Sequence, residues 1–129
     1  MDIIEKLNAR KSDLIVGKGA TEEEIHQAEE MLGVKIAQDF KKCLISFGVF
    51  AFDGHEMTGI TDNKRLSVVD VTKRQRVQNP EIPSDWYVIE EANMDGIVIW
   101  QNDRGTVFGT ASGGPTMQIA GSLIDFFKI

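Results

Sequence analysis

The sequence lacks the residues and segments that would point to a membrane or an oxidising compartment. Cys43 is the one cysteine, so no disulfide can form within the chain. No apolar run approaches the roughly 18 residues that a membrane-spanning helix needs. The N-terminal segment is acidic at Asp2 and Glu5, and it lacks the basic start and long apolar core of a signal peptide. These absences predict a soluble, cytoplasmic protein that does not contact membranes.

Positive charge is also scarce, because 20 acidic residues stand against 14 basic ones, for a formal net charge of −6. This balance disfavours binding to the phosphates of nucleic acids and favours a basic partner. Acidic surfaces are also common on soluble domains in general, so charge alone does not identify a partner. At 129 residues the chain is expected to be a single domain, residues 1–129, that folds without a disulfide or a structural metal.

The strongest local signals predict two helices, joined by an elbow, between residues 21 and 48. Thr21 and Glu24 have the spacing of a capping box, and residues 22–24 place three glutamates in the first turn, where the helix dipole favours negative charge. We therefore assign these glutamates to helix capping. Gly33 and Gly48 are expected to end the two helices. Apolar residues recur at helical spacing in both and predict a buried stripe on each: Ile25, Ala28, Met31 and Leu32, then Ile36, Phe40, Cys43, Leu44 and Phe47.

The rest of the chain predicts strands interrupted by helices. Asp53-Gly54 is the signal of a hairpin turn between residues 49–52 and 57–60. Further helices are expected at residues 2–10, at residues 66–78 after the N-cap Ser67, and after Ser122, whereas the apolar run 14–16 leads into a loop at residues 17–19. Further strands are expected at residues 86–90, 97–101, 106–110 and 116–120, and the apolar run 97–100 predicts a central strand. The predicted fold is α+β, with N-terminal helices packed on one antiparallel sheet, an inserted helix and a C-terminal helix.

Residues 24–48 also have a recognisable pattern, in which an acidic helix leads through Leu32-Gly33 to a helix containing Phe40 and Leu44 that ends at Gly48. This pattern resembles the entry motif of the SUKH superfamily. The resemblance continues through most of the chain from Ala20 onward, at Ile25, Ala28-Glu29, Ile36, Gly59-Ile60, residues 96–100, Gly105 and residues 122–126. The sequence departs from the usual family pattern at two turns, with Ala37 where a proline is usual and Phe47-Gly48 where Asn-Gly is usual.

The resemblance implies a SUKH-like fold and a function in binding. The superfamily includes bacterial immunity proteins, small cytoplasmic domains that bind and neutralise a partner toxin, often a nuclease. It also includes cell-wall-assembly regulator domains. The expected partner is therefore a cognate toxin with a basic nuclease domain, and the alternative is a host protein bound by a regulatory or scaffold module.

The residues themselves display no catalytic motif. The sequence shows no nucleophile with an adjacent base and no Cys/His ligand set, and Gly17-Lys18-Gly19 lacks the spacing of a phosphate-binding loop, so a turn is expected there. We therefore expect no enzyme activity, cofactor or metal. A small hydrolase using His55 with Asp53 is a further alternative, and a metal held by these residues and Glu56 would need ligands that the sequence does not display.

If the partner is a basic nuclease, carboxylates at loops and strand ends could imitate the phosphates of its substrate, and a buried aromatic residue could anchor the complex. For each carboxylate the alternative is a solvated position that binds nothing. The basic cluster of Lys73, Arg74 and Arg76 is expected to be a solvated helix face, and the oligomeric state and the toxin stay open. The predicted partner-binding residues are Asp53, Glu56, Asp62, Glu90, Glu91, Asp95 and Asp103, with Trp86 or Tyr87 as the anchor.

Overall fold

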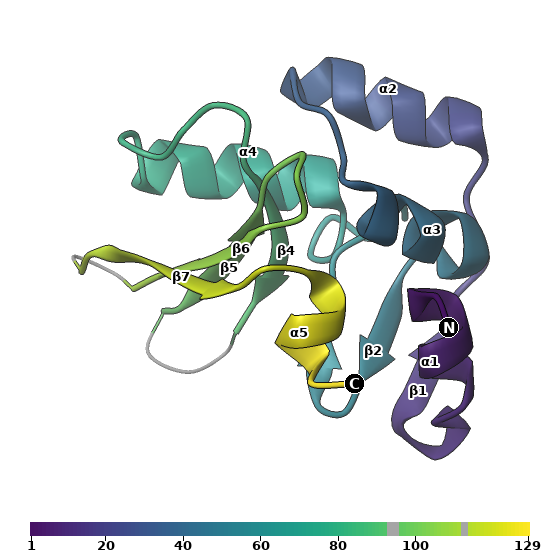
Figure 1. The fold of residues 1–129 in the computed structure, drawn as a ribbon. Coiled ribbons are helices and arrows are strands. Elements are labelled where there is room, and N and C mark those ends of the chain that lie inside the picture. The colour runs from purple at the N-terminus through teal and green to yellow at the C-terminus, as the bar shows by residue number, and fades with distance from the viewer. Residues whose placement is uncertain (93–95, 112–113) are drawn as a thin grey trace.

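A computed structural model describes residues 1–92, 96–111 and 114–129, which form an α+β fold (Figure 1). The α+β class predicted from the sequence is confirmed. The helices are α1 (Ile3–Asn8), α2 (Glu22–Leu32), α3 (Gln38–Phe47), α4 (Val68–Gln78) and α5 (Leu123–Phe127), with a 3₁₀ turn η1 (Lys11–Asp13). The strands are β1 (Leu14–Val16), β2 (Phe50–Phe52), β3 (His55–Glu56), β4 (Tyr87–Glu91), β5 (Val98–Gln101), β6 (Val107–Thr110) and β7 (Thr116–Ala120).

These strands form two antiparallel sheets, which corrects the prediction of one sheet. The first has the order β1-β2-β3 and the second the order β4-β5-β6-β7. The chain leaves the first sheet after β3 because the fully buried Met57 turns toward β4, where it forms an isolated bridge with Glu90. The Thr58 N–H then donates to the carbonyl of Ile89 at 2.8 Å. The two sheets therefore meet at a short seam, and the strand predicted at residues 57–60 does not form.

The first sheet contains one strand that was not predicted from the sequence. The apolar run 14–16 forms β1, which pairs with β2 at the edge of the sheet. Ile15 and Val16 are both exposed there, so the run lacks the alternation that marks a half-buried strand. The hairpin turn at Asp53-Gly54 is confirmed. Both residues have positive φ, 50° and 84°, the combination that a type I′ turn requires.

The second sheet follows the sequence prediction closely. The four strands lie within one residue of the predicted ranges, and Gly105 has the expected positive φ of 87° in the β5–β6 turn. Every residue of β5 is buried, as predicted for a central strand. β7 is the edge strand, and all its residues except Ala120 are exposed.

Three helices begin at capping residues that the sequence identified. The Thr21 hydroxyl accepts from the Glu24 N–H at 3.1 Å, and the Glu24 carboxylate accepts from the Thr21 N–H at 2.9 Å, which completes the predicted capping box. Gly33 ends α2 in the left-handed conformation, and Ser67 and Ser122 cap α4 and α5. The helix predicted at residues 66–78 is thus confirmed as α4.

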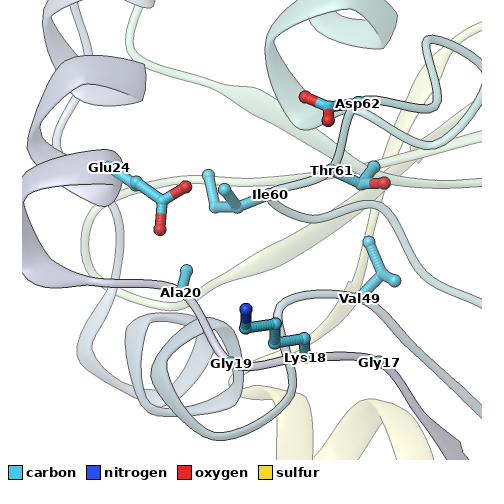
Figure 2. A pocket seen from close by; sticks show the side chains of 9 residues that line it. All are labelled: Gly17, Lys18, Gly19, Ala20, Glu24, Val49, Ile60, Thr61 and Asp62. Carbon is cyan, nitrogen blue, oxygen red and sulfur yellow. The ribbon is translucent and has the colours of Figure 1, made fainter.

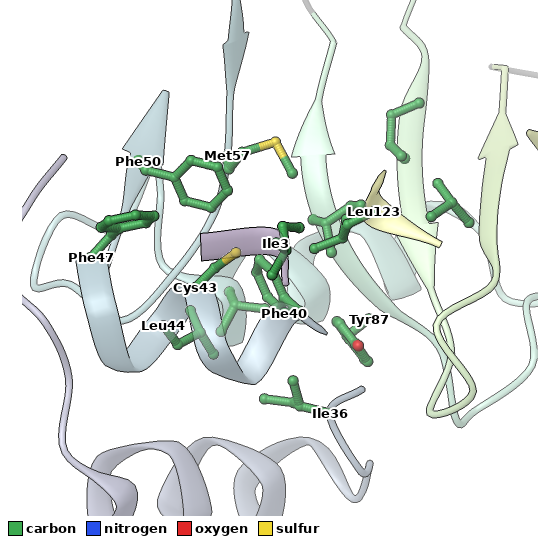
Figure 3. Packing of buried hydrophobic residues seen from close by; sticks show 14 of the residues in the cluster. Ile3, Ile36, Phe40, Cys43, Leu44, Phe47, Phe50, Met57, Tyr87 and Leu123 are labelled. Carbon is green, nitrogen blue, oxygen red and sulfur yellow. The ribbon is translucent and has the colours of Figure 1, made fainter. Parts of the chain in front are cut away.

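The main core lies between the helices and one face of the four-stranded sheet, and it includes the first sheet. Figure 3 shows Phe40, Cys43 and Leu44 of α3 facing Ile3 of α1 and Tyr87 of β4. A smaller cluster lies between α4 and the other face of the sheet, and it consists of Val71, Trp86, Val88, Val98 and Trp100. The four-stranded sheet is therefore covered on both faces at β4 and β5, which buries successive residues of these strands.

Candidate functional site

Helix α2 carries most of the net charge of the molecule. Five of the 20 acidic residues lie on it, and it has no lysine or arginine, so α2 accounts for five of the six excess negative charges. Figure 1 shows the helix on the outside of the molecule, where it packs against α3 and α4. Its buried residues are Ile25, Ala28 and Leu32. Met31, predicted to lie in this apolar stripe, is 61% exposed.

Four of these glutamates are exposed, and we call them the α2 acidic face: Glu22, Glu23, Glu24 and Glu30. Oε1 of Glu30 lies 2.7 Å from Nε2 of His26 on the helix surface, and Glu22 and Glu23 form no ion pair within the described residues. Glu29 differs, because its half-buried carboxylate accepts from the Ile36 N–H at 2.8 Å and lies 3.5 Å from the ammonium of Lys41. Glu29 therefore fixes the elbow, whereas the α2 acidic face is open to solvent.

A cavity of about 490 Å³ lies beside the N-terminal end of α2 (Figure 2). We call it the Lys18 pocket. Its lining comes from three separate segments of the chain and from the first turn of the helix. Figure 2 shows Glu24 and Asp62 reaching toward it from different sides, with the Lys18 side chain extending from the loop below them. The lining residues are Gly17, Lys18, Gly19, Ala20, Glu24, Val49, Ile60, Thr61 and Asp62.

Three glycines allow the backbones around this pocket to pack in direct contact. A Cβ on Gly19 would overlap the carbonyl oxygen of Ile45, and a Cβ on Gly48 would overlap that of Lys18. A Cβ on Gly59 would in turn overlap the carbonyl oxygen of Gly48. The segments are also joined by backbone hydrogen bonds from Gly17 to Val49, from Ala20 to Leu44 and from Ile60 to Gly48, at 2.9–3.0 Å. The floor of the Lys18 pocket is therefore a fixed backbone framework.

Two of the predicted partner-binding carboxylates, Glu56 and Glu91, accept hydrogen bonds from arginine side chains of the same chain. Arg65 donates to both oxygens of Glu56, at 2.6 and 3.1 Å, and these hydrogen bonds lower the pKa of Glu56 below its ordinary value. Glu91 accepts from Arg74 at 3.3 Å and from the amide of Gln75. Both glutamates line one hollow of about 190 Å³ with Arg65. This hollow has mixed charge, which corrects the prediction that these residues belong to an acidic face.

Glu90 is another correction, because it is 6% exposed and lies inside the molecule. Its two carboxylate oxygens lie 2.9 and 3.2 Å from Nδ1 of His55. The hydrogen bond to Glu90 raises the pKa of His55 above its ordinary value, against the smaller opposing effect of partial burial. The rings of Phe126 and Phe127 pack against the imidazole. The close partner of His55 is thus a structural carboxylate in the seam between the sheets, and the Asp53 pairing expected for a hydrolase does not form.

Neither aromatic residue predicted as an anchor is available to a partner. Tyr87 is fully buried, where its hydroxyl accepts from the Ala37 N–H at 2.9 Å and donates to Gln101 at 2.6 Å. Burial raises the pKa of Tyr87 well above its ordinary value. Trp86 is 8% exposed, and its ring stacks on Phe108 with the centroids 3.8 Å apart. Both predictions were wrong because α4 covers one face of the sheet while the main core covers the other.

Besides Glu56, three of the predicted carboxylates are exposed, namely Asp53, Asp62 and Asp103. Asp53 lies at the tip of the β2–β3 hairpin. Asp62 lines the Lys18 pocket with Glu24, and Asp103 lines a hollow of about 410 Å³ together with Glu30 and Asp85. Asp62 and Asp103 therefore lie beside the α2 acidic face, one at each end of the helix, and Asp103 also lies 4.0 Å from Nη1 of Arg104. Asp95 lies outside the described residues.

The sequence-based prediction misses this concentration of charge, because it assigns residues 22–24 to capping alone. The signal is present in the sequence, since no other helix in the described ranges combines five acidic residues with no lysine or arginine. Counting net charge by predicted element would have identified it.

Comparison with known protein families agrees with this fold. A family model named SUKH_5, with the description SMI1-KNR4 cell-wall, matches residues 1–128. The chain belongs to the SUKH superfamily. No curated protein matches it. In this SUKH chain, none of the helices in the described ranges is long and apolar enough to cross a membrane. Within the same ranges, no three or more His, Cys, Asp and Glu side chains are grouped as metal ligands.

Proposed function

We propose that this SUKH protein is an immunity protein, which binds a cognate bacterial toxin and blocks it without chemistry of its own. The toxin domain would be basic, as expected of a nuclease whose active site accommodates a phosphate backbone. Binding would involve the α2 acidic face together with Asp62 and Asp103.

One observation supports this proposal above the others, and it is the concentration of net charge on α2. The rest of the chain is nearly balanced, with 15 acidic and 14 basic residues, whereas α2 alone has five acids and no lysine or arginine. Because α2 lies on the outside of the molecule, its negative potential extends into solvent on one side (Figure 1). Such an asymmetric charge orients a basic partner during encounter and raises the association rate.

The arrangement also suggests how a nuclease would be blocked. The exposed carboxylates near both ends of the helix give this surface a negative potential, as the phosphates of a nucleic acid do, and they would occupy the cationic groove that otherwise holds the substrate. The fixed backbone beneath the Lys18 pocket and the capped start of α2 hold this surface in place before binding, so little conformational entropy is lost on association. Colicin nucleases and their immunity proteins form complexes that are among the tightest known, so inhibition of this kind can be nearly irreversible.

The proposal is tested by capture followed by inhibition. The purified protein is immobilised and exposed to an extract of its own cells, and each captured protein is then expressed separately. The expected result is a captured protein that degrades nucleic acid and arrests growth when expressed alone. Adding this SUKH protein in equimolar amounts should abolish both effects. A captured nuclease whose activity is unchanged by saturating SUKH protein would contradict the proposal.

The second candidate function is a regulatory or scaffold module that binds a host protein. The description of the matching family model, SMI1-KNR4 cell-wall, favours this alternative, because it refers to a role other than toxin immunity. The same capture experiment separates the two functions. A captured protein that is harmless when expressed alone, and whose assembly or location changes on deletion of the SUKH gene, would support the regulatory function and reject the immunity function.

A further inference from the structure

We infer that the Lys18 pocket is the acceptor site for one lysine or arginine side chain of the protein partner. The inference rests on the proposed binding function and specifies where on the surface the partner inserts its cation. It goes beyond the general charge of α2, because it concerns a defined cavity with its own residues.

The volume and the construction of the cavity suit such a ligand. About 490 Å³ is ample for a single long side chain together with some of its hydration water. Part of the lining is apolar, from Ala20, Val49 and Ile60, and this suits the methylene stem of a lysine or arginine. The close contacts at Gly19, Gly48 and Gly59 hold the floor in place, so the cavity exists before the ligand arrives. A preformed cavity binds its ligand more tightly, because no part of the protein has to become ordered on binding.

The charges of the lining select a cation. Glu24 and Asp62 supply two carboxylates against the single ammonium of Lys18, so the pocket has a net negative charge. One oxygen of Glu24, Oε1, already accepts from the backbone and hydroxyl of Thr21, whereas no hydrogen bond within the described residues involves Oε2. Within the same residues, Asp62 forms no ion pair and its side chain accepts no hydrogen bond. The two carboxylates lie on different sides of the cavity, so a cation bound inside it would be attracted by both (Figure 2).

The Gly17-Lys18-Gly19 segment thereby gains a role that its sequence alone does not reveal. The glycine at position 19 is required by the approach of the Ile45 carbonyl and serves the construction of the pocket. Lys18 lies between the glycines, with its ammonium directed toward the cavity in Figure 2. Its positive charge opposes that of the ligand, so we expect Lys18 to weaken cation binding and to reduce the net negative charge of the empty pocket.

The experiment uses the full chain, labelled with ¹⁵N, and the peptide acetyl-Gly-Arg-Gly-amide as the probe. Amide resonances of residues 17–20 and 60–62 are followed by NMR as peptide is added to millimolar concentration. We expect saturable shifts that are confined to these residues. The control peptide replaces arginine with citrulline, which has nearly the same shape and no charge, and it should cause no such shifts.

Variants of the pocket test whether each charged residue strengthens or weakens binding of the peptide. Asp62→Asn should weaken peptide binding about twofold to fivefold, which is the range for losing one exposed charge partner. Glu24→Gln should also weaken peptide binding, and it keeps an oxygen that can accept the capping hydrogen bonds. Lys18→Gln should strengthen binding by a similar factor. Glu81→Gln and Lys11→Gln, which are exposed and lie outside the pocket, make the same changes in net charge and should leave binding unchanged.

Several outcomes would overturn the inference. These are equal shifts with arginine and citrulline peptides, shifts centred elsewhere on the surface, no shifts at any concentration, or equal effects of the pocket variants and their controls. None of them bears on the capture experiment, because a toxin can bind this protein through α2 without using the pocket. Failure of the inference and failure of the proposed function are thus distinguishable.

Discussion

The backbone N–H of Ala37, at the start of α3, donates to the hydroxyl of Tyr87 on β4, across 50 residues of sequence. The same hydroxyl donates to Gln101, whose amide donates to Asp39 at 3.0 Å. Asp39 in turn accepts from the N–H of Leu123 at 2.9 Å. This chain of buried and half-buried hydrogen bonds joins α3, two strands of the second sheet and the start of α5, so it fixes the helices against the sheet.

Tyr87→Phe should destabilise the protein by about 1–3 kcal/mol, because it leaves the Ala37 N–H without its acceptor and Gln101 without its donor inside the core. Urea unfolding followed by tryptophan fluorescence measures the change. Thr116→Val removes an exposed hydroxyl from the edge strand β7 and should change the free energy of unfolding by less than about 0.5 kcal/mol. An equal loss in the two variants would contradict the role of the network.

Ala37→Pro should be costly in the native protein and much less costly in Tyr87→Phe. Ala37 has φ of −62°, which proline accepts, but its N–H is used by Tyr87, and a proline ring would occupy the space beside the hydroxyl. A double-mutant cycle in urea measures the coupling, which we expect to exceed about 1 kcal/mol. Additive losses would show that the two residues act independently.

The contact between His55 and Glu90 predicts a specific dependence of stability on pH. The pKa of His55 is raised in the folded protein, chiefly by the hydrogen bond to Glu90, from an ordinary value of 6.5. The contribution of this contact to stability is therefore complete below pH 6.5 and is lost as the pH rises through the raised pKa. Between about pH 6 and about pH 9, the free energy of unfolding measured in urea should fall more for the native protein than for His55→Gln. Equal losses in the native protein and in His55→Gln would show that the pKa of His55 does not change on folding.

Gly48→Ala should cost more than Gly33→Ala, because Gly48 has a close backbone contact and a backbone conformation that is less accessible to alanine than the left-handed conformation of Gly33. Both glycines end helices with positive φ, 71° and 65°. No atom lies within 4 Å of a Cβ on Gly33, whereas a Cβ on Gly48 overlaps the carbonyl of Lys18. We expect a loss of about 1–2 kcal/mol for Gly33→Ala and about 3 kcal/mol or more for Gly48→Ala, measured by urea unfolding. Similar losses would mean that the floor of the Lys18 pocket can rearrange.

The helices and turns could be predicted because their signals are local. Thr21 with Glu24, Ser67, Ser122 and Asp53-Gly54 each fix a boundary through residues at most three positions apart. The division into two sheets could not be predicted in this way. It depends on Met57 leaving β3 to bridge β4, and nothing in the sequence of that segment marks the change.

The candidate site was predicted less well, because charge neutralisation depends on partners distant in sequence. Glu90 pairs with His55 from 35 residues away, and Glu91 pairs with Arg74 from 17 residues away. Burial of both faces of β4 also turned Tyr87 from a predicted surface anchor into a core residue. The net negative charge of α2 is visible in the sequence. The assignment of residues 22–24 to helix capping explained these glutamates and did not take account of the net charge of the whole helix.

The α2 acidic face predicts how association with the captured toxin depends on charge. Glu23 and Glu30 are exposed on α2, and Glu23→Gln/Glu30→Gln should slow association severalfold at low salt and flatten its salt dependence, because electrostatic steering acts mainly on the association rate. Stopped-flow fluorescence over a salt series measures both effects. Asp13→Asn/Glu81→Gln removes the same net charge from other parts of the chain and should have little effect. Equal slowing by the two double variants would mean that the association rate depends on the net charge of the whole protein and that the charges of α2 have no particular effect on it.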